Sequence, residues 1–180
     1  YMVTPMDGSR PSHLAAQIMP RDGIHFHCFN LDNTRLLGDL PDPNQPGGLR
    51  RLIEMDIETG EFTDLYTHPG GAESGLWSPD GTLISFKTME TGVPELRILH
   101  PATGQITPVS NTHVGDYRWV EEPDGRLSLL YWDNQWLAWK SSIELSPDGE
   151  VRIEKPVAHP FEVSKAARFD AMDNRGRIFT

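Results

Sequence analysis

The stretch Leu76-Trp77-Ser78-Pro79-Asp80-Gly81-Thr82-Leu83-Ile84-Ser85-Phe86 decides the fold. Its two apolar runs flank an Asp-Gly pair, and glycine supplies the positive φ that a tight turn between two strands requires. Two more apolar runs follow at 96–99 and 105–109, separated by a turn at Gly104. Four short strands joined by tight turns predict one blade of a β-propeller.

The same turns return along the chain at the period of a propeller blade. Gly60, Gly104 and Gly149 are separated by 44 and 45 residues. A second set of turn glycines has intervals of 58, 44 and 51 residues: Gly23, Gly81, Gly125 and Gly176. Intervals near 44 residues match one four-stranded blade. We therefore expect an all-β chain, a propeller of four-stranded antiparallel blades with about three complete blades and partial blades at both ends.

The repeat divides the chain into a single propeller segment over residues 1–180. The expected parts are a partial blade at 1–10, blades at 11–69, 70–112 and 113–158, and a partial blade at 159–180. The first blade is longer than the others, and we assign the extra length to an inserted loop at 37–48, which holds three prolines and three glycines. Proline interrupts a strand ladder, and long loops on rigid scaffolds often carry function. Asp39 and Asp42 in this loop are therefore candidate ligand contacts.

Aromatic side chains are dense near residues 131–139. Trp132, Trp136 and Trp139 are candidate ligand contacts, because large aromatic faces with a polar edge bind sugars and protein partners well. Packing between blades is the competing interpretation for most of them. Trp136 lies in the expected turn at 133–136, so it is the member that we expect to be exposed. Trp77 and Trp119 precede the turns at Gly81 and Gly125, and we expect both to pack between blades.

Composition excludes several classes of partner. A formal net charge of −10 argues against a sequence-independent grip on nucleic acid, which requires clustered Lys and Arg. No apolar run approaches the length that spans a bilayer, so no membrane insertion is expected. Cys28 is the only cysteine, which excludes an internal disulfide and predicts a small buried strand residue.

The strongest metal-like pattern is His25-Phe26-His27. Alternate residues of a strand point to one face, so the two imidazoles could approach one ion. His13 lies shortly upstream, which gives the candidate metal set His13, His25 and His27. Solvated histidines on a polar strand face are the alternative. A divalent metal is thus the one cofactor that the sequence leaves open, and otherwise none is expected.

The run from Trp77 to Phe86, preceded by Asp56-Ile57-Glu58-Thr59-Gly60, resembles the repeat of TolB-like propellers. The resemblance covers residues 50–125 best. It departs at Glu121-Glu122-Pro123-Asp124-Gly125, where glutamate replaces the serine of the motif, and at the first blade, where only the turn Asp22-Gly23 is kept. These motifs specify a fold and not a chemistry.

The resemblance implies a recognition or substrate-gating scaffold that binds a protein or carbohydrate ligand on one rim and continues into further blades or a neighbouring domain. Two alternatives stay open. One is a metal-dependent lyase similar to oligogalacturonate lyases, whose propellers hold a divalent metal with histidines and a glutamine, here matched by Gln17. The other is the propeller domain of a prolyl-oligopeptidase-like hydrolase, although the chain contains no Gly-x-Ser-x-Gly elbow. Catalytic residues stay unassigned, and only the resemblance favours a periplasmic or secreted location.

Overall fold

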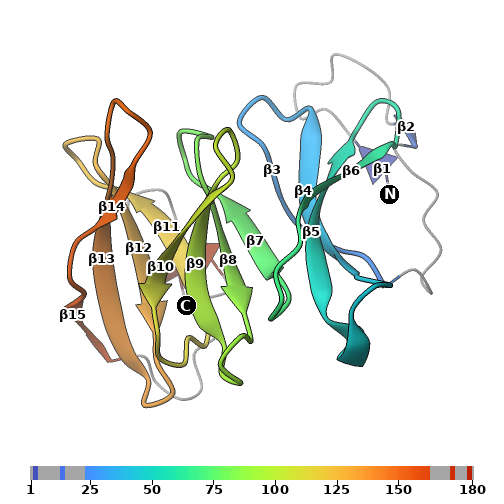
Figure 1. Ribbon diagram of the computed structural model, residues 1–180. Helices are drawn as coiled ribbons and strands as arrows, with labels where there is room; N and C mark the ends of the chain where they lie inside the picture. The colour runs from blue at the N-terminus through green and yellow to red at the C-terminus, as the bar shows by residue number, and fades with distance from the viewer. Residues whose placement is uncertain (1, 4–12, 15–22, 163–170, 173–177, 180) are drawn as a thin grey trace.

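The computed structural model describes residues 2–3, 13–14, 23–162, 171–172 and 178–179, and the regular structure among these is β-strand apart from one short 3-10 turn (Figure 1). The first sheet contains β3 (His25–Phe29), β4 (Arg35–Pro41), β5 (Arg50–Asp56) and β6 (Phe62–Tyr66) in that order. The second contains β7 (Glu73–Trp77), β8 (Ile84–Thr88), β9 (Glu95–His100) and β10 (Gln105–Ser110). A short 3-10 turn, η2 (Pro46–Gly48), lies between β4 and β5.

The third sheet contains β11 (Tyr117–Glu121), β12 (Leu127–Trp132), β13 (Leu137–Leu145) and β14 (Val151–Ile153), and β15 (Val157–Glu162) also pairs with β13. Two short antiparallel pairs complete the described structure: β1 (Met2–Val3) with β2 (His13–Leu14), and β16 (Ala171–Met172) with β17 (Ile178–Phe179). All pairings are antiparallel between strands that follow each other closely in the chain. The three large sheets stand side by side like blades, so the expectation of an all-β propeller is confirmed (Figure 1).

The turns that the sequence predicted close the blades as expected. The amide of Ser78 donates to the carbonyl of Leu83 over 2.8 Å, and the Asp80 carboxylate accepts hydrogen bonds from the hydroxyls of Ser78 and Thr82. Gly81 has a φ of +72°, which explains the glycine. The third sheet keeps the same turn although Glu122 replaces the serine, because the Glu122 backbone supplies both turn hydrogen bonds.

The first sheet departs from the prediction at its inner turn. β3 and β4 are joined by residues 30–34 and not by a turn at Gly23, which precedes β3. Asn33 takes the positive φ of +59°, and Asp32 accepts hydrogen bonds from the amide and hydroxyl of Thr34. Asparagine and aspartate adopt such turns without glycine, which is why a count of glycines missed this one. The loop predicted at 37–48 is correspondingly wrong in its first part, because 37–41 belong to β4.

The boundary predicted between residues 158 and 159 is also wrong. β15 pairs with β13, with Trp139 opposite Ala158 and Lys140 opposite Val157, so residues 159–162 extend the third sheet. Pro156 separates β14 from β15, because proline cannot donate to a strand ladder. The two strands thus form one interrupted outer strand. At the other end, β2 pairs with β1 and is no part of the first sheet, although the predicted blade began at residue 11.

Apolar side chains fill the spaces between the sheets. One cluster joins the first sheet to the second through Leu37 and Leu52 against Ile84 and Phe86, and Trp77 packs on it. A larger cluster joins the second and third sheets, and there the Trp119 indole donates to the carbonyl of Leu76 over 3.2 Å. The predicted packing of Trp77 and Trp119 between blades is confirmed. In the described part of the chain, no helix has the length and apolar character to cross a bilayer.

Candidate functional site

The first strands of the three sheets enclose a cavity of about 360 Å³. Its lining combines aromatic, aliphatic, acidic and basic groups: Phe26 and His27 of β3, Ser74 and Leu76 of β7, and Asp116, Tyr117 and Arg118 at the start of β11. Each of these strands begins at the same end of the molecule, so loops and strand starts from three sheets meet there. We call this end the cavity rim, and the opposite end, where residues 30–34, 78–81 and 122–125 turn, the turn rim.

A buried carboxylate organises one side of the cavity rim. Asp39 on β4 is 1% exposed. Its Oδ2 lies 2.5 Å from Nε2 of His27 and accepts the backbone N–H of Ser74 over 2.9 Å. Its Oδ1 accepts from Nε of Arg50, and Nδ1 of His25 lies 3.5 Å away. Three hydrogen-bond donors, from three strands and two sheets, therefore converge on this one carboxylate, with His25 beside them.

The backbone of β3 explains how both histidines reach Asp39. His25 pairs opposite Asp39 in the register of β3 and β4, and the register shifts between Phe26 and Cys28. Both imidazoles thus approach the same carboxylate, although the irregularity at His27 interrupts the regular alternation of the strand. The strands approach closely here, because a Cβ on Gly38 would lie 2.5 Å from the carbonyl oxygen of His25. Any larger residue at position 38 would push β3 away from the carboxylate.

The cluster fixes the charge of Asp39. Burial alone would raise the pKa of this carboxyl, but hydrogen bonds from His27, the Ser74 amide and Arg50 outweigh it, so the pKa of Asp39 is lowered. The group is an anion near neutral pH. Arg50 is the permanent cation beside it, and it also donates to the Asp39 carbonyl over 3.0 Å.

These residues do not fit a divalent metal. Both oxygens of Asp39 already accept hydrogen bonds, and a guanidinium in the cluster repels a second cation. Within residues 23–162 and the other described positions, no group of three or more His, Cys, Asp or Glu side chains is arranged to hold a metal ion. The side chain of His13 lies outside the described residues. The donor chemistry of His25 and His27 therefore favours a hydrogen-bonded cluster over a metal centre.

Ser74 connects all three sheets at the edge of the cavity. Its φ is +56°, a strained value for a residue with a side chain. Its N–H is held by Asp39 of the first sheet, and its carbonyl accepts a hydrogen bond from the Tyr117 hydroxyl of the third. That hydroxyl also lies 2.9 Å from the carbonyl of Ser85, and burial raises the pKa of Tyr117. Contacts from both neighbouring sheets thus hold the strained residue in place.

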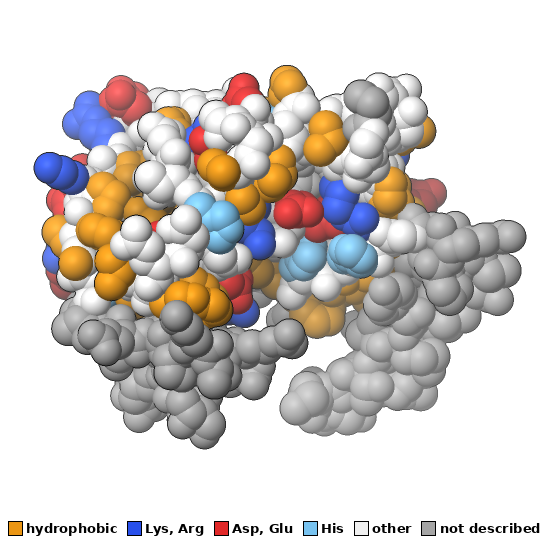
Figure 2. All heavy atoms as spheres, turned by 90° about the horizontal axis from the view of Figure 1, so that it is seen from below, with side chains coloured by type: hydrophobic (Ala, Val, Ile, Leu, Met, Phe, Trp, Pro, Cys, Tyr) orange, Lys and Arg blue, Asp and Glu red, His pale blue; other side chains and the backbone are white. Residues whose placement is uncertain are grey.

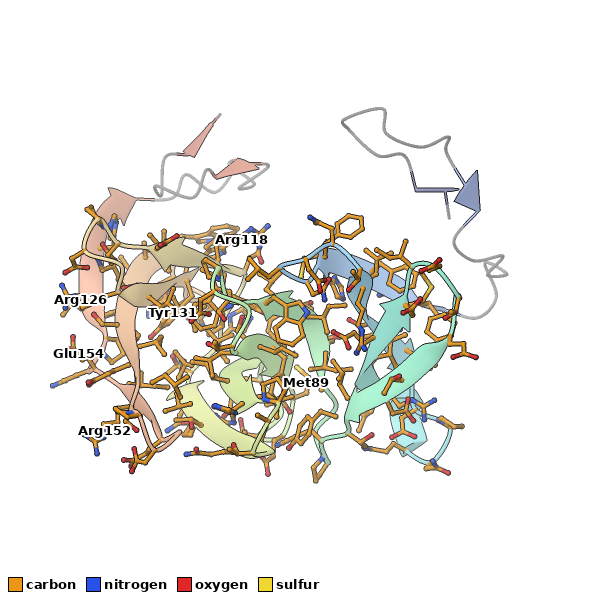
Figure 3. The ribbon with its side chains drawn as sticks, turned by 90° about the horizontal axis from the view of Figure 1, so that it is seen from above. Met89, Arg118, Arg126, Tyr131, Arg152 and Glu154 are labelled. Carbon is orange, nitrogen blue, oxygen red and sulfur yellow. The ribbon has the colours of Figure 1, made fainter. Side chains whose placement is uncertain are left out.

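The other side of the cavity carries a partly exposed ion pair. Nη1 of Arg118 donates to Asp116 over 3.0 Å and to the Tyr117 carbonyl over 2.6 Å. Nearby, Nζ of Lys87 donates to the carbonyl of Gly115 over 3.3 Å. Figure 2 shows this end of the molecule, where histidines gather beside acidic and basic side chains. Figure 3, from the opposite end, shows Arg118 on the concave side of the arc of sheets.

The predicted ligand contacts occupy different settings. Asp39 does not line the cavity itself, because it is the buried partner of His27 and Ser74, which do. Asp42 is also buried, and its carboxylate accepts the backbone N–H of Asn44 over 2.9 Å, which stabilises the loop after β4. Trp132 is 7% exposed, so it presents little surface to a ligand. A ligand-binding role for these residues stays a prediction.

The turn after β12 holds the other two tryptophans. Trp136 has a φ of +65° and is half-buried, so the expectation of an exposed indole is wrong. Trp139 is half-buried too, and its indole N–H donates to Asp133 over 2.9 Å. Asp133 also accepts the N–H groups of Gln135 and Leu137, which closes the turn tightly around the indoles. A ligand-binding role for Trp136 and Trp139 also stays a prediction.

Sequence reasoning missed Arg50, Ser74, Asp116 and Arg118 as members of the site. The repeat contained one signal that finds two of them. Ser74 and Arg118 are 44 residues apart, one blade period, and each lies near the start of a first strand. Aligning the blades on their first strands would therefore have brought both to the cavity rim.

The sequence matches no protein-family model and no curated protein. The structure is similar to solved β-propellers. TolB from Acinetobacter baumannii is 18% identical with a TM-score of 0.57, over 84% of this chain and 36% of that one. A putative TolB from Agrobacterium tumefaciens is 16% identical with a TM-score of 0.53, over 84% and 55%. The β-propeller domain of the Trilobed protease from Pyrococcus furiosus is 15% identical with a TM-score of 0.50, over 75% and 41%.

Proposed function

Taking the chain as a TolB-like β-propeller segment, we propose that it is a recognition scaffold that binds a protein or carbohydrate ligand at the cavity rim. One observation carries the proposal: a single cavity of about 360 Å³ receives polar and apolar side chains from the first strands of three sheets. Concave sites with a few convergent polar groups are where proteins bind ligands. The chain spans 36% and 55% of the two TolB chains, which supports a continuation into further blades or a neighbouring domain around this cavity.

Hydrogen bonds within the protein also hold side chains of the cavity rim in place before a ligand binds. Asp39 is held by three hydrogen-bond donors, and Ser74 is fixed by hydrogen bonds to two neighbouring sheets. Side chains already held in place lose little conformational freedom on binding, which improves affinity. A metal-dependent lyase has less support, because Arg50 takes the place that a metal would need beside Asp39.

The test maps where defined ligands bind. Short peptides and neutral or acidic oligosaccharides are titrated into isotope-labelled protein, and backbone amide shifts are followed by NMR. We expect the largest shifts at Ser74, Tyr117 and Arg118, which border the cavity. Shifts that gather on the turn rim, for example around Asp80 and Asp124, would contradict the proposal and move the binding surface to the other end.

A further inference from the structure

The cavity rim carries cations as well as carboxylates. Arg50, Lys87 and Arg118 lie there next to Asp39, Glu73 and Asp116 respectively. Glu73 lies directly opposite Lys87 in the register of β7 and β8. These cations stand out in a chain with a net charge of −10.

The Asp39 carboxylate at the rim already accepts hydrogen bonds within the protein, whereas the Arg118 guanidinium has N–H groups that its described hydrogen bonds leave unused. Asp39 accepts from His27, Arg50 and Ser74, which leaves it a poor acceptor for a ligand. Among the described contacts, the hydrogen bonds of Arg118 use Nη1 alone, and its side chain is 36% exposed. A guanidinium offers five N–H donors in a planar fork that matches a carboxylate. Arg118 can therefore take a further anionic partner at the cavity.

The cavity also offers an apolar surface beside this donor. Phe26 and Leu76 line it together with Arg118 and His27. The Phe26 ring stacks on that of Phe62 with centroids 6.4 Å apart, so its position is fixed by the first sheet. A ligand that fills this space presents a carboxylate to Arg118 and an apolar group to Phe26 and Leu76. A uronate sugar supplies the carboxylate without the apolar group.

We infer that the cavity rim binds an organic carboxylate carried next to an apolar side group, and that its source is the free C-terminus of a protein segment ending in an apolar residue. The inference rests on the proposed function and names its ligand class. Arg118 receives the carboxylate, Phe26 and Leu76 contact the terminal side chain, and Asp116 lies within reach of the preceding backbone N–H groups.

The experiment compares two peptides that differ only in their end group. Acetyl-Ala-Ala-Leu is titrated into the 180-residue chain by calorimetry, as the free acid and as the C-terminal amide. We expect the free acid to bind at least about tenfold more tightly, because only the free acid accepts a charge-assisted hydrogen bond from Arg118.

Matched variants assign the effect to the rim. Arg118→Gln should weaken the free acid about tenfold and leave the amide unchanged, whereas Arg152→Gln, an exposed arginine paired with Glu150 on the outer strand β14, should change neither (Figure 3). Circular dichroism confirms that each variant is folded.

Several results would overturn the inference. Equal binding of acid and amide, or of Arg118→Gln and the parent chain, would do so. If both peptides still shift the resonances around Ser74, the recognition function stands and only the carboxylate inference fails. If 4-methylpentanoate binds as tightly as the peptide, a free organic acid replaces the C-terminus as the source. If glucuronate binds more tightly than either, the ligand is a carbohydrate and the peptide assignment is wrong.

Discussion

The two rims of this propeller are built by different kinds of contact. On the turn rim, Asp32, Asp80 and Asp124 each accept hydrogen bonds from residues two positions away in the chain. On the cavity rim, Asp39 binds Arg50 and His27, 11 and 12 positions away, and the amide of Ser74, 35 positions away. Local contacts make the blades repeat, whereas contacts between strands and sheets hold Asp39 in the site. Stability should therefore respond to substitutions at the two rims very differently.

The largest expected effect is the loss of the buried carboxylate. Asp39→Ala leaves Arg50 and His27 without their partner in a buried setting, and we expect it to lower the free energy of unfolding by about 3–5 kcal/mol. Asp124→Ala, its match on the turn rim, removes an exposed ion pair with Arg126 and should have a much smaller effect (Figure 3). Urea unfolding measures both. Equal losses would mean that the two rims do not differ as described.

A smaller effect is expected from the hydroxyl that joins the second and third sheets. Tyr117→Phe leaves the carbonyls of Ser74 and Ser85 without their buried donor and should cost about 1–3 kcal/mol. Tyr131→Phe is the matched control, because its hydroxyl lies 3.4 Å from Ser141 within the same sheet. If both variants lose the same free energy of unfolding, the hydroxyl of Tyr117 does not stabilise the contact between the second and third sheets.

This contrast also explains what the sequence could predict. The Asp-Gly and Thr-Gly turns carry their own hydrogen bonds, so Gly60, Gly81 and Gly104 predicted the blades correctly. Asn33 was missed because asparagine adopts a positive φ at some positions only, so the residue type alone does not predict the turn. Of the site, the proximity of His25 and His27 was predicted from strand alternation, although the strand is irregular at His27. Their partner Arg50 did not, because the register of β4 against β5 decides which charges meet.

Acid should destabilise the two rims in ways that salt distinguishes. The pKa values of Asp39 and Asp124 are both lowered on folding, so the unfolded chain binds more protons between the folded and unfolded pKa values. Their contribution is fully present above about pH 5 and is lost as pH falls through the lowered folded values. The contribution of Asp39 should persist in 0.5 M NaCl (about 4 Å Debye length), while that of exposed Asp124 should shrink. Melting temperatures of Asp39→Asn and Asp124→Asn across pH 2–6 check this.

The smallest expected effect is that of a divalent metal on the histidine pair. Arg50 donates to the carboxylate between His25 and His27, so an ion arriving there would have to displace a buried guanidinium. Metal analysis of freshly purified protein should therefore give the same content for the parent chain and for the His25→Ala, His27→Ala variant, and added Mn²⁺ or Zn²⁺ should leave the melting temperature unchanged. Arg50→Gln sharpens the comparison, because it removes the cation that binds the Asp39 carboxylate. This variant should bind Zn²⁺ weakly, whereas the parent chain should not bind it. A stoichiometric ion in the parent chain that the double histidine variant loses would instead show that the cluster opens to admit a metal, and would return the lyase alternative to first place.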